Sequence, residues 1–205
     1  MLQRDTRVVE IHPVTPERWP ALVDLFERPG PRGAWPRTSA CYCMFWRLPP
    51  AEYELGFRQQ SLENVSGGPN KQAMEDLVAR GTVPGLLAYR DGEPIGWVAV
   101  SPRSELGRLE QVPTFGPAEE PGDWSVSCFY VHRSEWRAGV GAALLDAAVA
   151  RAREHGATAV EGYPVKAGSI DPYTGYDTMF AASGFELLRP GRGRGRALWR
   201  RALSG

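Results

Sequence analysis

The stretch Val131–Ala152, VHRSEWRAGVGAALLDAAVARA, decides the fold assignment of this sequence. It joins a strand-like run, WSVSCFYVH, to a helix-like run that begins at Val140 and ends at His155. Gly139 and Gly141 stand two residues apart at this junction, although a glycine inside a helix costs about 1 kcal/mol relative to alanine. Glycines at such a place indicate that another molecule approaches the backbone closely.

The first turn of a helix is suited to an anion, because its N–H groups have no intrahelical acceptor and carry a partial positive charge. Glycines leave room for a phosphate to reach those donors. The spacing is not the dinucleotide fingerprint, since no third glycine follows, and it is not a P-loop, since no Lys-Ser/Thr pair follows Gly141. We therefore predict a pyrophosphate held by backbone amides in another kind of strand–helix unit.

The remaining pattern predicts an α/β protein with a mixed sheet and helices on its faces. Gly85–Arg103 has the pattern of a β-hairpin, with Asp91-Gly92 at the turn. Pro29–Pro50 is expected to be a loop rich in aromatic residues. Further strands are expected within Arg7–Val14, Ala157–Val165, Phe185–Pro190 and Arg196–Leu203, and further helices within Thr15–Arg28, Ala51–Gln60, Asn70–Arg80 and Pro172–Gly184.

Composition narrows the class of protein. A length of 205 residues favours one domain, and 24 basic against 24 acidic residues argue against a dedicated nucleic-acid surface. No apolar run is long enough to span a bilayer, and the N-terminus lacks a signal-peptide core, so we expect a cytoplasmic protein with reduced thiols. Three cysteines do not suit a disulfide framework or a four-ligand zinc site, and no metal is expected. The abundance of Ala, Arg, Gly and Pro suggests a GC-rich, bacterial genome.

The segment CFYVHRSEWRAGVGAALLDAAVARAREHGATAVEGYPV, followed by MFAASGFELL, resembles the GNAT superfamily of N-acetyltransferases. That family carries Arg/Gln-x-x-Gly-x-Gly/Ala at this turn and a Leu-Leu pair in the helix. The resemblance implies an acyl-CoA N-acyltransferase fold with a central mixed, mostly antiparallel sheet flanked by helices. Residues 1–205 would form one domain: 1–84 supply a strand, helices and an acceptor lid, and 85–205 supply the acyl-CoA-binding core and a C-terminal hairpin.

The resemblance also implies acetyl-CoA as co-substrate, bound by the end of the strand and by the turn. The expected cofactor-binding residues are Phe129, Tyr130, Val131, Trp136, Arg137, Ala138, Gly139, Val140, Gly141 and Ala142. Two positions depart from the family pattern. Trp136 replaces the usual Arg or Gln, so that phosphate binding would depend on backbone amides, and Phe180 replaces a tyrosine that acts as general acid in many members.

Catalytic candidates are Glu161 as general base, with Asp171 second, and Tyr173 or Tyr176 as the acid that replaces the missing tyrosine. The alternatives are an ion-paired or exposed glutamate and tyrosines that only pack. Cys128 is interpreted as a small core residue rather than a nucleophile.

Acceptor-binding candidates are the aromatic residues Trp35, Tyr42, Phe45 and Trp46, which would favour a small hydrophobic amine. Their alternative role is to fill the core. Two other functions stay open: an acyl-CoA-binding module with little turnover, and an acetyltransferase acting on a protein or aminoacyl-tRNA amine. No membrane or nucleic-acid partner is expected, and self-association into a homodimer is left open.

Overall fold

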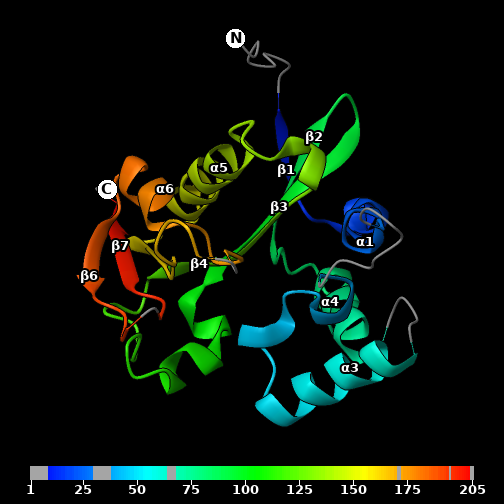
Figure 1. Cartoon of the computed structure of the whole chain (residues 1–205), viewed down its shortest axis with the longest axis horizontal. Coiled ribbons are helices and arrows are strands. Elements are labelled where there is room, and N and C mark those ends of the chain that lie inside the picture. The colour runs from blue at the N-terminus through cyan, green and yellow to red at the C-terminus, as the bar shows by residue number, and fades with distance from the viewer. Residues whose placement is uncertain (1–8, 30–37, 64–67, 170–171, 194, 204–205) are drawn as a thin grey trace.

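The fold is built on one seven-stranded sheet, seen in a computed structural model that describes residues 9–29, 38–63, 68–169, 172–193 and 195–203 (Figure 1). The strand order is β1-β2-β3-β4-β5-β7-β6. All neighbours are antiparallel except β4 and β5, so the predicted mixed, mostly antiparallel sheet is confirmed. The strands are β1 Glu10–Pro13, β2 Gly85–Arg90, β3 Glu93–Pro102, β4 Trp124–Val131, β5 Ala159–Gly162, β6 Glu186–Arg189 and β7 Leu198–Ala202.

Helices cover both faces of the sheet, as Figure 1 shows. The α-helices are α1 Trp19–Glu27, α2 Thr38–Cys41, α3 Pro50–Glu63, α4 Pro69–Ala79, α5 Val140–Glu154 and α6 Asp177–Ala182. Short 3₁₀ turns are η1 Pro16–Arg18, η3 Met44–Trp46, η4 Arg103–Glu105, η5 Gly107–Gln111 and η6 Arg133–Glu135. Helix α5 packs its apolar stripe on one face, with Leu144 and Leu145 fully buried. On the other face, α1 and α4 bury Leu22, Phe26 and Met74 over Trp97.

The two parallel strands share only a short ladder. β4 pairs with β5 at three positions, from Trp124–Val160 to Val126–Gly162, and then continues to Val131 paired with β3 but not with β5. Its register with β3 slips at the same place, because Val100 faces Val126 while Ala99 faces Cys128. A bulge of this kind bends and twists the strand that carries it. Beyond Val126, β4 and β5 are therefore no longer paired, and residues 128–131 lie beside a gap between the two strands.

Two segments differ from the sequence-based expectation. Within the expected loop Pro29–Pro50, the described part contains α2 and η3, because apolar side chains there pack onto the sheet rather than lie in solvent. The helix expected over Pro172–Gly184 begins only at Asp177, since Val165 forms a parallel bridge with Tyr176 and holds the chain extended there. The Asp91-Gly92 hairpin and the end of α5 near Gly156 agree with the predictions.

Gly162, the last residue of β5, makes room for an aromatic ring. A Cβ atom added at this position would lie 2.0 Å from Cε1 of Phe180. We expect Gly162→Ala to lower the free energy of unfolding by about 1–3 kcal/mol, because a methyl group forced into a packed core displaces its neighbours. Urea denaturation measures the change. The double variant Gly162→Ala/Phe180→Leu should regain part of the loss, and an unchanged single variant would contradict this close packing.

Candidate functional site

The end of β4 presents backbone groups to a gap beside β5. The His132 N–H donates to the Ile95 carbonyl of β3 at 2.9 Å. Backbone groups in an antiparallel strand point alternately to the two sides, so the N–H and C=O groups of Phe129 and Val131 point away from β3. The Phe129 N–H donates to the Tyr173 carbonyl at 2.6 Å. The Val131 carbonyl accepts from the Trp136 indole N–H at 2.9 Å. On the side facing β5, the backbone groups of residues 129 and 131 are therefore bonded by Tyr173 and Trp136 rather than by a neighbouring strand.

The turn that enters α5 lies directly after this edge. Gly139 caps the helix in a left-handed conformation (φ 82°), and no side chain caps the first turn. A Cβ at Gly139 would meet nothing within 4 Å, so the backbone is open on that side. Arg137 is also left-handed (φ 65°). The amides of Val140, Gly141 and Ala142 belong to the first helical turn, where helix geometry supplies no acceptor.

Trp136 stands on the surface of this turn. Its side chain is 62% exposed, and its indole points back to the Val131 carbonyl. The Arg133 guanidinium lies 5.7 Å from the centre of the indole ring. Trp136 thus joins the turn to β4, and Arg133 is the cation that lies against it.

The adjacent residues Phe129 and Tyr130 of β4 point to opposite faces of the sheet. Phe129 packs with Phe180 on the α5 side, whereas Tyr130 packs with Cys128 and Phe26 on the α1 side. Burial raises the pKa of the Tyr130 hydroxyl, and the nearby Tyr173 hydroxyl adds to the effect. The bond from the Phe129 N–H to the Tyr173 carbonyl places Tyr173 beside this part of β4, although the two segments are far apart in the sequence.

The two candidate acids, Tyr173 and Tyr176, and the phenylalanine at the usual acid position, Phe180, lie in different surroundings. Tyr173 is half-buried beside the open edge of β4, and its carbonyl already receives the Phe129 N–H. Tyr176 is also half-buried, and its hydroxyl donates to the Ser169 carbonyl at 3.3 Å. Phe180 is fully buried against Phe185 and the α5 face. The ring at the family's usual acid position is thus a core residue here.

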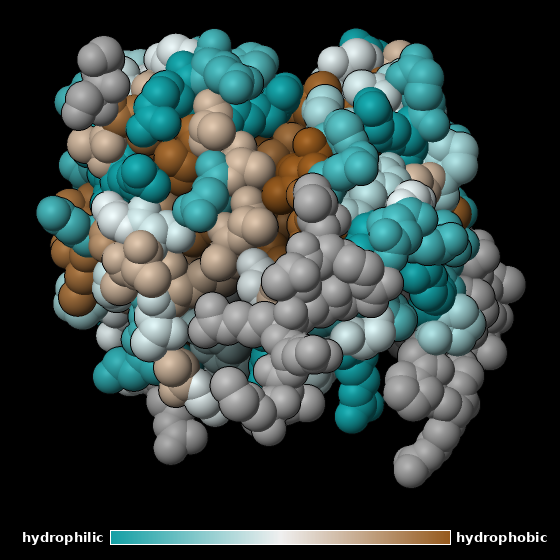
Figure 2. Space-filling model, turned by 90° about the horizontal axis from the view of Figure 1, so that it is seen from above, coloured by the Kyte–Doolittle hydropathy of each residue, from teal (hydrophilic) through white to brown (hydrophobic). Residues whose placement is uncertain are grey.

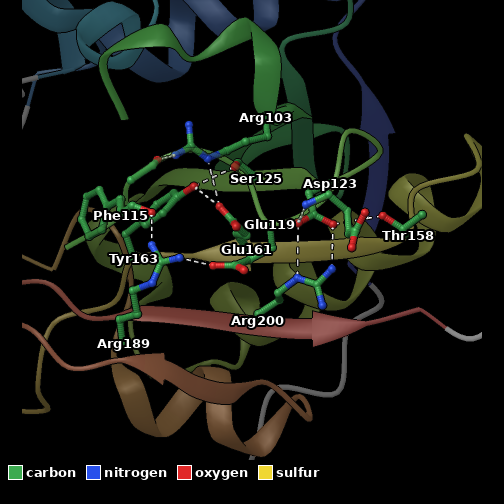
Figure 3. Close-up of polar contacts among 12 residues, drawn as sticks. Arg103, Phe115, Glu119, Asp123, Ser125, Thr158, Glu161, Tyr163, Arg189 and Arg200 are labelled. Atoms are coloured by element: carbon green, nitrogen blue, oxygen red, sulfur yellow. Dashed lines mark hydrogen bonds and ion pairs between the residues drawn. The ribbon is translucent and has the colours of Figure 1, made fainter. Parts of the chain in front are cut away.

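Glu161 lies in a buried polar cluster (Figure 3). Its carboxylate, with no exposed surface, accepts from Arg103 Nε at 2.9 Å and from the Tyr163 hydroxyl at 3.0 Å. The Tyr163 hydroxyl lies 2.8 Å from Ser125 Oγ. Burial raises the pKa of the Glu161 carboxyl, although Tyr163 and Arg103 favour its ionised form. The sequence analysis missed Arg103, Tyr163 and Ser125, because only Glu161 stood out by residue type and position.

A second ion pair, between Asp123 and Arg200, lies at the start of β4 and β5. The Asp123 carboxylate has no exposed surface and accepts from Arg200 Nη2 at 2.9 Å and from Thr158 Oγ1 at 3.0 Å (Figure 3). Arg200 lies on β7, and Thr158 directly precedes β5. This pair therefore links the entrances of β4 and β5 to the C-terminal hairpin.

The predicted acceptor aromatics lie over the α1 side of the sheet. Tyr42 is fully buried, and burial together with the Glu27 carboxylate raises the pKa of its hydroxyl. Trp46 is nearly buried against Phe115 and Tyr163. Phe45 is half-buried beneath the Arg108 guanidinium, which lies 4.0 Å from its ring centre. Trp35 falls outside the described residues. Tyr42 and Trp46 thus fill the core, and an acceptor contact by this group stays a prediction.

The surface is hollowed between two parts of the molecule, and hydrophobic residues line the bottom of the hollow (Figure 2). A separate cavity of about 410 Å³ lies between η3, α4 and η4. It is lined by Met44, Arg47, Leu48, Ala73, Asp76, Leu77, Arg80, Thr82 and Glu105. No residue of β4 lines this cavity, so it is distinct from the open edge of the strand.

Two kinds of feature are absent from the described part of the chain. It contains no helix with the length and hydropathy that crossing a bilayer requires. It also contains no group of three His, Cys, Asp or Glu side chains arranged to hold a metal ion.

Comparison with known proteins agrees with the fold described above. A sequence profile of the Acetyltransferase (GNAT) family matches residues 42–168. The GNAT domain of PAT from S. lividans is 20% identical with a TM-score of 0.57, and the match covers 98% of this chain and 93% of that one. PaiA N-acetyltransferase from Thermoplasma acidophilum, solved with coenzyme A, is 13% identical with a TM-score of 0.54, and the match covers 96% and 99%.

An N-acetyltransferase from Staphylococcus aureus Mu50 is 11% identical, with a TM-score of 0.56 and coverage of 96% and 99%. The chain matches none of the curated protein sequences with which it was compared. At these identities the solved structures support the fold, while the profile covers more than half of the chain and carries the family assignment. The chain therefore belongs to the GNAT family of acetyltransferases.

Proposed function

We propose that this acetyltransferase moves the acetyl group of acetyl-CoA to the amine of a small, hydrophobic or aromatic acceptor by direct attack. The observation that carries the proposal is the juxtaposition of two backbone features: the edge of β4 at residues 129–131 and the glycine turn of α5. One suits the amides of a pantetheine arm, and the other suits a pyrophosphate. The proposal keeps the expectation of a cytoplasmic, bacterial protein.

Three features of these residues support a site for acetyl-CoA. The open backbone at Gly139 and the unpaired first-turn amides of α5 would receive the phosphates. The Val131 carbonyl would exchange the Trp136 indole for an amide of the pantetheine arm, and the Phe129 N–H would exchange the Tyr173 carbonyl for the acyl end of the ligand. Trp136 offers no charge to the phosphates, and Arg133 or Arg137 would supply the nearest cation.

The reaction needs an amine that has lost its proton, a polarised carbonyl and a protonated leaving thiolate. The Phe129 N–H, freed from Tyr173, would donate to the thioester oxygen. The Tyr173 hydroxyl would protonate the thiolate, because the backbone of Tyr173 lies against the same strand edge, whereas Phe180 cannot donate a proton. Tyr176 is the second candidate for this role.

Glu161 remains the proposed base, through a relay rather than by direct contact. Its carboxylate is enclosed, but the Tyr163 hydroxyl joins it to Ser125 Oγ on β4. Ser125 precedes the bulge at the gap between the strands by only two residues. Ser125 and Tyr163 are themselves fully buried, so a water in the gap would have to carry the proton from the amine to these hydroxyls. Arg103 would balance the charge of Glu161.

Tyr173→Phe tests the acid. We expect kcat to fall about 10²-fold or more, the contribution typical of a positioned general acid, while the Kd of acetyl-CoA changes less than about threefold. Stopped assays of free thiol give kcat, and isothermal titration gives Kd. Tyr176→Phe, which also removes one hydroxyl nearby, is the comparison: it should keep most of the rate if Tyr173 is the acid, and it should lose the rate instead if Tyr176 is the acid. An unchanged rate for Tyr173→Phe across the pH range would dismiss Tyr173 as the acid.

The experiment for the function itself is acetyl-CoA turnover over a library of amines, peptides and aminoacyl-tRNA, read as free thiol. Turnover restricted to small hydrophobic amines supports the proposal. A second candidate, an acyl-CoA-binding module, is favoured by Phe180 and Trp136 at the two departing positions. It predicts tight binding of acetyl-CoA by titration without thiol release for any acceptor.

A further inference from the structure

The three cysteines of the chain meet in the folded protein. Cys41 ends α2, Cys43 lies in the turn before η3, and Cys128 lies on β4. The Cys43 and Cys128 sulfurs are 3.2 Å apart, although 85 positions separate them in the chain. The Cys41 sulfur accepts the Cys43 N–H at 3.5 Å. This cluster is not used by the proposed acetyl transfer, and it is not a metal site among the described residues.

The two sulfurs need only a small approach to form a bond. A disulfide has a sulfur–sulfur distance of about 2.05 Å, so the pair must close by roughly 1 Å. Cys43 lies outside the sheet, in a turn where Tyr42 (φ 41°) and Cys43 (φ 53°) are both left-handed. This conformation is energetically disfavoured for a residue other than glycine. A small change in the backbone angles of the turn therefore costs less here than it would in a regular helix or strand. Cys128, by contrast, is held in the ladder with β3.

The two thiols differ in access. Cys128 is half-buried, whereas Cys43 is only 7% exposed. Contacts with the Cys128 and Cys41 sulfurs, together with burial, raise the pKa of the Cys43 thiol. An oxidant therefore reaches Cys128 first, and Cys43 stands beside it as the thiol that completes the exchange.

We propose that Cys43 and Cys128 form a reversible disulfide when the protein meets a low-molecular-weight disulfide such as oxidised glutathione. The Cys128 thiolate attacks one sulfur of the oxidant, forming a mixed disulfide and releasing one glutathione thiolate. Cys43 then loses its proton and attacks the Cys128 sulfur, which releases the second glutathione as a thiol. Two protein thiols are oxidised, and one glutathione disulfide is reduced to two thiols.

The bond would tie the segment between α2 and η3 to the strand that carries the open edge. Cys128 directly precedes Phe129, whose N–H faces the gap beside β5. The site is thus a covalent modification site next to the proposed donor position. It stands on the sulfur geometry alone, so its test does not depend on which acceptor the enzyme uses.

The experiment treats the folded, reduced protein with oxidised glutathione and then measures free thiols after denaturation and the intact mass. We expect the thiol count to fall from three to one, with a mass lower by two hydrogen atoms for the internal bond, and dithiothreitol should restore all three. Tryptic digestion should join the peptide of residues 38–47 to that of residues 109–133.

The variant Cys41→Ser identifies the partner, since Cys41 and Cys43 share one tryptic peptide. This variant should still lose both remaining thiols and give the same cross-link. Cys43→Ser and Cys128→Ser should give only glutathione adducts. The proposal is overturned if the wild type gains glutathione without any cross-link, or if Cys41→Ser prevents the cross-link and Cys43→Ser keeps it. Thermal unfolding of the reduced variants verifies that each is folded before oxidation.

Discussion

Replacing Gly139 with glutamate is expected to weaken acetyl-CoA binding at least about 100-fold, a loss of roughly 2.7 kcal/mol. The backbone at Gly139 is open, so the new side chain would occupy the space in which we place the pyrophosphate. Its carboxylate would also repel the phosphates. A negative charge near a helix N-terminus stabilises the helix itself, which partly offsets the backbone strain at a φ of 82°. Isothermal titration measures the affinity.

Two control variants distinguish the effects of backbone conformation, side-chain size and charge on the affinity of Gly139→Glu. Gly139→Asn keeps a residue that tolerates the left-handed conformation, and it should retain most of the affinity. Gly139→Gln has the size of glutamate without its charge, and its affinity should lie between the other two. Equal affinity for wild type and Gly139→Glu would remove the cofactor site from this turn, whatever the enzyme acetylates.

Replacing Arg103 with methionine is expected to lower the free energy of unfolding by about 3–5 kcal/mol, because it leaves a buried carboxylate without its partner. Arg103 is 2% exposed and Glu161 is 0% exposed. The change also removes the bond from Arg103 Nη2 to the Gly116 carbonyl, at 2.6 Å. Urea denaturation at pH 7 measures the loss.

The pH dependence of the free energy of unfolding is expected to show that the unpaired Glu161 carboxylate causes the loss in Arg103→Met. Burial raises the pKa of Glu161 in the folded protein, so the folded state binds its proton at a higher pH than the unfolded chain does. The stability lost in Arg103→Met should therefore be regained as the pH falls through that raised pKa, and should be lost again as the pH rises. Arg103→Met/Glu161→Gln, which removes both charges, should recover most of the loss at pH 7. An equally large deficit in the double variant would show that the charge of Glu161 is not responsible.

Much of the fold was predictable because its signals are local. The glycine turn, the helix behind it and the Asp91-Gly92 hairpin each depend on residues that are neighbours in the sequence. The described part of Pro29–Pro50 was predicted as loop because its aromatic residues show no helical or strand period. Their packing against the sheet depends on strands that come much later in the chain.

Of the candidate site, only the part formed by backbone groups, the glycine turn, could be predicted from the sequence. Gly139 was identified from its spacing to Gly141, and it caps α5 in a left-handed conformation that the sequence analysis did not predict. Side-chain partners were not predictable, since Arg103 and Glu161 are 58 positions apart and Cys43 and Cys128 are 85 apart. Nothing in one sequence says which of many such residues meet. For the same reason Phe180 was recognised as a missing acid, but its place in the core was not foreseen.

The three-pair ladder between β4 and β5 also bears on how the chain assembles. β2, β3 and β4 follow one another in sequence and in space, so their hairpins can form while the ribosome is still making the rest. β5 must cross over through α5 before it can join, and β7 inserts beside it last. A nascent chain that ends before residue 159 lacks β5 and therefore one side of the gap at the end of β4, so we expect recognition of coenzyme A to arise only after β5 has been made.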